Sequence, residues 1–126
     1  MKKVWKWVKK VVSYPLKAWY MLTDYLRYYK AVQVADEAHE KDSDRYYVMP
    51  SMDKKLIIVD RKNFRLLKRK GYINKNATIN TVLDECFYYT ASMQGQQIAE
   101  DDRKNRYKEY KQWCRAMRLI DHYIGV

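Results

Sequence analysis

The sequence contains few of the residues that interrupt regular structure. Among 126 residues it has three glycines and two prolines, which favours long helices over a turn-rich β fold. Its two cysteines, Cys86 and Cys114, lie far apart and match neither a disulfide framework nor a paired metal motif. We therefore expect both to be reduced structural thiols. No uncharged run approaches the length of a membrane span, and Lys6, Lys9 and Lys10 interrupt any secretory h-region, so secretion is not expected.

Motifs of known enzyme classes are also missing. The chain has no glycine-rich phosphate loop, no His-Glu-x-x-His zinc motif and no nucleophile elbow. His39 and His122 stand in no motif, and Asp42-Ser43-Asp44 lacks the glycine and the distal glutamate of a calcium loop. We predict a non-enzymatic protein with no catalytic residue, no cofactor, no metal site and no small-molecule substrate.

The positive charge is concentrated in two blocks of the sequence. The formal net charge is +11. Residues 1–33 carry eight lysines and arginines against one acid, and residues 61–76 carry seven with no acid. Residues 34–60 are net acidic, with seven acids against four bases. This distribution predicts an acidic partner surface but leaves nucleic acid, membrane and protein open.

The first block begins with a predicted amphipathic helix over residues 2–12, because its apolar and basic residues separate onto opposite arcs at about 100° per residue. Ser13-Tyr14-Pro15 is expected to interrupt it, so residues 1–14 are predicted to form an arm on a single domain, residues 15–126. The apolar arc, expected to dock on a partner, consists of Val4, Trp5, Trp7, Val8, Val11 and Val12. The basic arc consists of Lys2, Lys3, Lys6, Lys9 and Lys10. The same cross-section suits an anionic membrane surface, which is kept as an alternative.

After the arm, the pattern predicts a second helix over residues 16–41, with residues 35–44 as its frayed end or a linker. Two β-prone runs around a turn-like segment predict a β-hairpin over residues 45–60. Thr78 is a suitable N-cap for a helix that begins at Ile79, with Phe87 and Tyr89 on its apolar side. Gly95 marks a break before a last helix over residues 97–123. The apolar side of the second helix is expected to comprise Ala18, Trp19, Leu22, Tyr25, Leu26, Tyr29 and Val32.

The second basic block is predicted to form a short helix over residues 61–70, with Asp60 as its N-cap and Gly71 as its C′ residue. Only a narrow apolar face around Phe64 is available for packing. The remaining surface, a candidate contact for phosphates or an acidic protein, comprises Arg61, Lys62, Arg65, Lys68, Arg69 and Lys70. Phosphate binding through such a surface falls steeply with salt.

One segment carries a resemblance to a known group. Tyr46-Tyr47-Val48-Met49-Pro50, followed by Lys55-Leu56-Ile57-Ile58-Val59-Asp60 and Arg61-Lys62-Asn63-Phe64-Arg65, resembles small uncharacterised proteins of tailed, crAss-like bacteriophages. The resemblance covers residues 46–73 and transfers no functional residue. It implies a phage accessory protein, one kind of which is a virion component made in the bacterial host cytoplasm.

Together these features predict an α+β fold that is predominantly helical, with long helices, one β-hairpin, a short basic helix and an N-terminal amphipathic arm. The leading functional hypothesis is a structural or accessory protein of a phage virion. It would dock on neighbouring virion subunits in a large assembly and contact an acidic protein surface or packaged DNA. The alternatives are a nucleic-acid-binding or host-takeover regulator, and a peripheral membrane protein that binds through its first helix.

Overall fold

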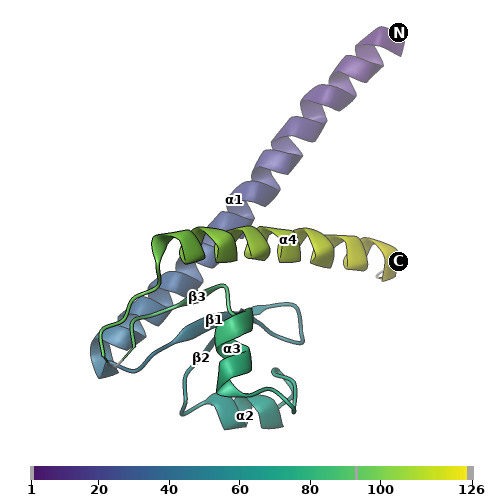
Figure 1. The fold of residues 1–126 in the computed structure, drawn as a ribbon. Coiled ribbons are helices and arrows are strands. Elements are labelled where there is room, and N and C mark those ends of the chain that lie inside the picture. Colours follow the sequence, from purple (N-terminus) through teal and green to yellow (C-terminus); the bar gives the residue numbers. More distant parts are fainter. Residues whose placement is uncertain (1, 93, 125–126) are drawn as a thin grey trace.

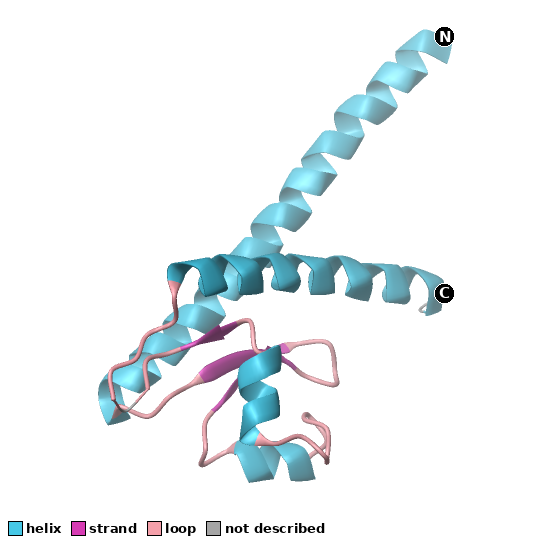
Figure 2. Ribbon diagram, in the orientation of Figure 1, coloured by secondary structure: helices cyan, strands magenta, loops and turns pink. Residues whose placement is uncertain are grey.

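The computed structural model describes residues 2–92 and 94–124, and the side chains described are those of residues 18–92 and 94–120. Two long helices and two short helices surround a small sheet (Figures 1 and 2). The chain order is α1 (Lys2–Asp42), β1 (Tyr47–Pro50), β2 (Leu56–Val59), α2 (Phe64–Arg69), α3 (Ile79–Glu85), β3 (Tyr88–Tyr89) and α4 (Glu100–Ile124). The predicted class, α+β and predominantly helical, is confirmed.

The sheet has three antiparallel strands in the order β2-β1-β3. The predicted hairpin is present, with Val48 opposite Ile58 across the β1–β2 pair. Strand β1 is buried on both faces: Val48 belongs to one apolar cluster, while Tyr47 and Met49 belong to the other. This division follows from the alternation of side chains along a strand. The central strand therefore joins two hydrophobic cores.

The first core lies between one face of the sheet and the two long helices. Its buried members come from both helices, from β1 and from the segment around β3: Tyr28, Val32, Ala35, Val48, Phe87, Tyr88, Tyr110 and Cys114. The second core lies on the other face, under the short helices α2 and α3 (Figure 1). It comprises Tyr47, Met49, Val59, Phe64, Ile73, Ala77, Val82 and Cys86. The result is a three-layer body.

The predicted interruption at Ser13-Tyr14-Pro15 is wrong, because α1 is continuous from Lys2 to Asp42. A proline inside a helix removes one backbone hydrogen bond and costs about 3 kcal/mol. Such a local cost does not have to end a helix whose neighbouring turns keep their own hydrogen bonds. The assignment of residues 1–14 as a separate arm stays a prediction, but no break in the helix marks its boundary.

The end of α1 is also more ordered than the sequence indicates. The sequence predicts residues 35–44 as the frayed end of the helix or a linker, yet the helix continues to Asp42 and Ala35 is completely buried in the first core. Asp36, one residue further on, accepts a hydrogen bond from the Tyr88 hydroxyl at 2.6 Å. The polar composition of this segment reflects its solvent-facing side, while its other side packs on the sheet.

The short basic helix begins later than predicted. Helix α2 starts at Phe64, and the three preceding residues form a turn. Asp60 stabilises that turn rather than the helix: its Oδ1 accepts from the Asn63 amide at 2.8 Å, and the Asn63 side chain accepts from the Asp60 amide at 2.8 Å. Gly71 has a positive φ of 85° after the helix, and the Tyr72 amide donates to the Leu67 carbonyl. The prediction that Gly71 is the C′ residue of this helix is thus confirmed.

Helix α3 begins where the sequence predicts and ends earlier. Thr78 forms a capping box with Thr81, but the helix stops at Glu85. Phe87 and Tyr89 therefore do not belong to its apolar side. The Phe87 amide donates to the Val48 carbonyl at 2.7 Å, which brings the chain onto the open edge of β1. The segment after Glu85 therefore pairs with β1, although its apolar residues also suit a continued helix.

Gly95 lies in the loop before the last helix, as predicted, with a positive φ of 81°. Helix α4 covers Glu100–Ile124, close to the expected residues 97–123. It presents its aromatic side to the first core, where Tyr110 is fully buried. Figure 1 shows that α4 crosses α1, whose N-terminal part extends away from the body.

Candidate docking surface

Large apolar side chains are exposed on several sides of α1, among them Tyr20, Met21 and Tyr25. Four of them follow a 3-4-3 spacing, and we call them the α1 stripe: Trp19 (61% exposed), Leu22 (50%), Leu26 (51%) and Tyr29 (54%). A 3-4 spacing places residues along one side of a helix, as in helices that pair with another helix. Single exposed apolar residues are common, whereas a contiguous row of this kind is typical of interaction surfaces.

The α1 stripe faces away from the body. The residues of α1 that pack into the first core are Tyr28, Val32 and Ala35. At 100° per residue, the centre of the α1 stripe lies roughly 130° around the helix from the centre of this packed face. The body therefore covers one side of α1 and leaves the stripe without cover among the described residues.

The sequence predicted a single apolar side for this helix, and the structure divides it in two. Val32 is buried, but Trp19, Leu22, Tyr25, Leu26 and Tyr29 are exposed. Tyr28 and Ala35, which were not included in that side, supply the packed face instead. No signal in the sequence distinguishes the two sides, because both are apolar and the larger residues lie on the outer one.

The candidate residues of the N-terminal arm lie outside the residues whose side chains are described. They are Lys2, Lys3, Val4, Trp5, Lys6, Trp7, Val8, Lys9, Lys10, Val11 and Val12. The structure establishes only that their backbone belongs to α1. Their roles in partner docking and in contacting an acidic surface stay predictions.

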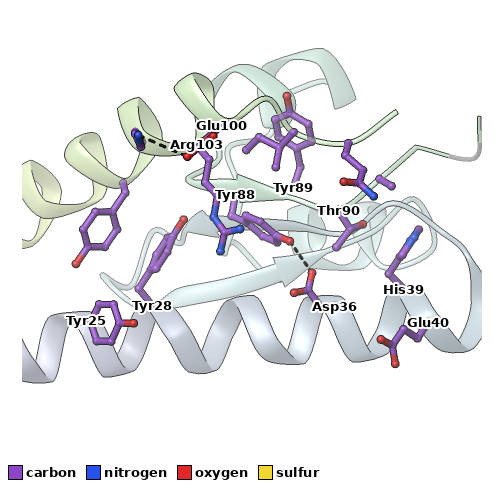
Figure 3. A pocket seen from close by; sticks show the side chains of 15 residues that line it. Tyr25, Tyr28, Asp36, His39, Glu40, Tyr88, Tyr89, Thr90, Glu100 and Arg103 are labelled. Carbon is purple, nitrogen blue, oxygen red and sulfur yellow. Dashed lines mark hydrogen bonds and ion pairs between the residues drawn. The ribbon is translucent and has the colours of Figure 1, made fainter. Parts of the chain in front are cut away.

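Beside the α1 stripe lies a groove between α1, β3 and the start of α4 (Figure 3). Its volume is about 790 Å³, and an adjoining hollow of about 420 Å³ follows α1 along the edge of the stripe. Arg103 reaches from α4 over the Tyr88 ring, with its guanidinium carbon 5.3 Å from the ring centroid. Tyr28 and Asp36 complete the floor of the groove. The Asp36 carboxylate accepts a hydrogen bond there from the Tyr88 hydroxyl. The groove is aromatic, with charged groups at its rim.

Tyr28 and Tyr88 of the groove are neutral hydrogen-bonding groups. Burial raises the pKa of Tyr28 to about 12, and burial together with the Asp36 carboxylate raises the pKa of Tyr88. Burial likewise raises the pKa of the Cys86 thiol to about 11, so only about one molecule in ten thousand holds the nucleophilic thiolate at neutral pH. None of these groups is prepared for nucleophilic chemistry.

The candidate residues of the second basic block divide into engaged and free cations. Lys62 pairs with Asp44 at 3.4 Å, and Lys68 donates to the Ala77 carbonyl at 2.9 Å while lying over the Phe64 ring. The other four are exposed and have no side-chain partner within the described part of the chain: Arg61, Arg65, Arg69 and Lys70. We call these four the free α2 cations; the contact of all six residues with phosphates or an acidic protein stays a prediction.

Two arginines attach α4 to the rest of the body, and sequence reasoning gave them no role. Arg27 of α1 lies over the Tyr110 and Trp113 rings, at 5.9 and 5.5 Å from their centroids. Arg106 of α4 donates to the Leu83 carbonyl at 2.8 Å and the Cys86 carbonyl at 2.6 Å, at the C-terminus of α3. No local sequence pattern predicts these contacts, because each arginine and the groups it contacts are far apart in the sequence.

Within the described residues, no group of three or more His, Cys, Asp or Glu side chains is arranged to hold a metal ion. Among the same residues, no helix combines the length and apolar character needed to cross a membrane. No protein-family model matches the chain, and no curated protein or solved structure matches it at a significant level. The α1 stripe and the free α2 cations are therefore the features from which a function can be inferred.

Proposed function

We propose that the chain is a non-enzymatic docking protein that binds a neighbouring subunit of a larger assembly through the α1 stripe. The observation that carries this proposal is the row Trp19, Leu22, Leu26 and Tyr29, which is half or more exposed on a helix that extends beyond the body (Figure 1). Burying one such side chain contributes about 1.5–3 kcal/mol. Four of them would supply most of the driving force for a stable helix-mediated contact.

The assembly we propose is the virion of a tailed bacteriophage, with the protein made in the host cytoplasm and incorporated as an accessory component. Support comes from the resemblance of residues 46–73 to small phage proteins. These residues form the β1–β2 hairpin, α2 and the turn that follows, which together build most of the second core. The resemblance thus covers a structural unit and leaves α1, the docking element, outside it.

The free α2 cations would contact an acidic protein surface or packaged DNA within the particle. Helix α2 lies on the side of the sheet remote from α4 (Figure 1), so α1 and α2 can serve two partners at once. Each phosphate neutralised by a lysine or arginine releases counterions, which gives binding a steep salt dependence. This surface also supports the second candidate, a nucleic-acid-binding or host-takeover regulator.

Incorporation into particles tests the docking function. Mass spectrometry of purified particles should detect the wild-type chain at a stoichiometric level. The variant Leu22→Glu/Leu26→Glu should lose incorporation, because it places two charges in the α1 stripe. Met52→Glu is the matched control, since Met52 is 68% exposed in the β1–β2 turn, away from α1. Absence of the wild-type chain from particles, or normal incorporation of the double variant, would contradict the proposal.

A salt titration of DNA and RNA binding separates the regulator from the docking protein. Arg65→Glu/Arg69→Glu removes two free α2 cations, whereas Lys108→Glu removes an exposed cation of α4 as a control. If nucleic acid is the partner, only the first variant should lose affinity and reduce the salt slope by about two. If Arg65→Glu/Arg69→Glu binds nucleic acid as tightly as the control Lys108→Glu, α2 is excluded as the contact.

Sedimentation with anionic vesicles tests the remaining alternative, peripheral membrane binding through the first helix. Removing residues 1–12 should abolish sedimentation if this segment is the anchor. Vesicle binding that survives the deletion would exclude the segment as an anchor.

A further inference from the structure

We infer that the partner on the α1 stripe is a basic amphipathic helix of a neighbouring subunit. Its apolar residues cover the stripe, and its arginine or lysine side chains enter the hollow that adjoins the C-terminal half of α1. This inference rests on the proposed docking function and specifies the chemistry of the partner. It combines three features of the described residues: the exposed stripe, two unpaired glutamates in line with it and an aromatic hollow beside both.

Glu37 and Glu40 continue the line of the α1 stripe, and we call them the α1 carboxylates. At 100° per residue, both lie within about 40° of the centre of the stripe around the helix axis. They follow Leu26 and Tyr29 by about three turns, or about 16 Å along the helix. Both glutamates are exposed. A helix packed along the stripe therefore also passes over the α1 carboxylates.

The α1 carboxylates have no ion-pair partner within the described part of the chain, although Lys41 is exposed one turn after Glu37. Asp36, by contrast, accepts the Tyr88 hydroxyl. The C-terminus of a helix carries a partial negative charge and favours cations, so two carboxylates near it are unfavourable in the free protein. A local rule broken in this way is typical of a functional surface.

The hollow beside the α1 carboxylates suits the side chain of an arginine or lysine. Its volume is about 420 Å³, and both glutamates line it together with Tyr25 and Tyr29. The two tyrosine rings stack with 6.1 Å between their centroids, and both side chains are about half exposed. A cation over an aromatic face is attracted by the ring, and a nearby carboxylate adds a charge-assisted hydrogen bond. Arginine suits both contacts, because its guanidinium is planar and forked.

The charge of the hollow selects a cationic partner. Its lining contains one guanidinium, that of Arg103, which reaches from α4 over the Tyr88 ring at 5.3 Å (Figure 3). Against it stand three carboxylates of α1: Asp36, Glu37 and Glu40. The lining is therefore net negative in a protein whose net charge is +11. Nucleic acid or an anionic membrane is repelled here, and an entirely apolar helix would desolvate the α1 carboxylates without pairing them.

Two pairs of synthetic helical peptides test this partner class on the full-length chain. Each peptide has about 24 residues on an alanine and glutamine background, with four leucines at 3-4 spacing. In one pair two charged residues follow the leucines by about three turns, and in the other they precede them, which covers both directions. The charged residues are arginines in one member of each pair and glutamates in the other. Fluorescence anisotropy of labelled peptide measures the affinity at about 50 mM salt, where charge contacts are weakly screened.

The wild type should bind the arginine peptide of one pair at least about tenfold more tightly than its glutamate counterpart, because two exposed contacts change from attractive to repulsive. Glu37→Arg/Glu40→Arg should reverse this preference. Glu37→Gln/Glu40→Gln, which preserves the side-chain shape, should reduce it about threefold. Leu22→Glu/Leu26→Glu should lose affinity for every peptide, because the stripe supplies the apolar contact.

Asp84→Arg/Glu109→Arg is the matched control. It changes the net charge as much as Glu37→Arg/Glu40→Arg does, and its two positions are exposed and line neither the groove nor the hollow. The control should therefore keep the wild-type preference. Far-UV circular dichroism of each variant should match wild type, since every substituted position is exposed.

Each other result decides against the inference. A wild type that binds no peptide at about 100 µM, or that binds arginine and glutamate peptides equally, excludes a basic helix as the partner. A preference that survives both substitutions of the α1 carboxylates, or that the control also abolishes, excludes these carboxylates as its cause. A wild type that binds no peptide but sediments with anionic vesicles, in a manner that depends on Leu22 and Leu26, assigns the stripe to a membrane.

The same proteins separate this inference from the proposed function. If the arginine preference is absent but Leu22→Glu/Leu26→Glu still loses incorporation into particles, the stripe docks on a subunit of different chemistry, and only the basic helix is wrong. If the chain prefers the arginine peptide through the α1 carboxylates but never enters particles, the docking site stands and the assembly is wrong.

Discussion

Arg106 offers the sharpest test of how α4 is held on the body. Its Nη1 donates to two carbonyls at the end of α3, those of Leu83 and Cys86, and its Nε pairs with Asp102 at 2.9 Å. The side chain is only 14% exposed. Arg106 therefore serves as a C-terminal cap of α3 that is supplied by another helix, since the last carbonyls of a helix have no partner within it.

We expect Arg106→Met to lower the free energy of unfolding by about 3 kcal/mol. Hydrogen bonds from a charged donor contribute roughly 1.5–3 kcal/mol each, and two carbonyls lose theirs. Methionine keeps most of the apolar volume, so packing contributes little to the loss. Asp102 retains the Tyr89 hydroxyl as a donor at 2.9 Å, which limits the effect on that carboxylate. A loss of this size is a large part of a typical stability of about 5–15 kcal/mol.

Urea unfolding followed by far-UV circular dichroism measures the effect. Lys104→Met is the control, two residues earlier on the exposed side of α4, because Lys104 and Glu100 form an exposed pair at 3.6 Å that should contribute less than about 0.5 kcal/mol. Arg106→Lys should give an intermediate loss, since one ammonium group cannot reproduce the fork of a guanidinium. If Arg106→Met costs less than about 1 kcal/mol, or no more than the control, the capping argument is refuted.

Three further predictions follow from individual contacts. Thr78→Ala should cost about 1 kcal/mol in the same assay, and adding Thr81→Ala should cost little more because both residues serve one capping box. Stability should fall as the pH rises from 10 towards 12, because the folded protein holds the phenol of Tyr28 neutral up to a pKa of about 12 while the unfolded chain ionises near 10; constant stability over that range would contradict it. An aromatic disulfide reagent at neutral pH should label neither Cys86 nor Cys114 until urea unfolds the chain, since both thiols are buried, and prompt labelling of the native protein would refute their burial.

The parts of the fold that could be predicted from the sequence are those with a local cause. Two β-prone runs around a turn gave the β1–β2 hairpin, and its register follows from side-chain alternation along the strands. Thr78 and Gly71 marked a helix start and a helix end, because each position requires a particular side chain or backbone conformation. These signals act within a few residues and need no knowledge of tertiary contacts.

The parts that could not be predicted depend on contacts between distant segments. Strand β3 has two residues, too few to show a period, and it forms only because the edge of β1 is open there. The outward side of α1 carries larger apolar residues than its packed side, so a search for the most apolar side selects the wrong one. The division of the α2 cations into engaged and free depends on Asp44 and the Ala77 carbonyl, which only the fold brings near.

The length of α1 is itself an argument for a partner. The body supplies packing contacts for its C-terminal part, whereas the N-terminal part extends beyond the crossing with α4 (Figure 1). Each residue added to a helix contributes little by itself, and most helical stability in proteins comes from tertiary packing. The lysines of α1 would keep an apolar surface soluble in the free protein, since net charge opposes association.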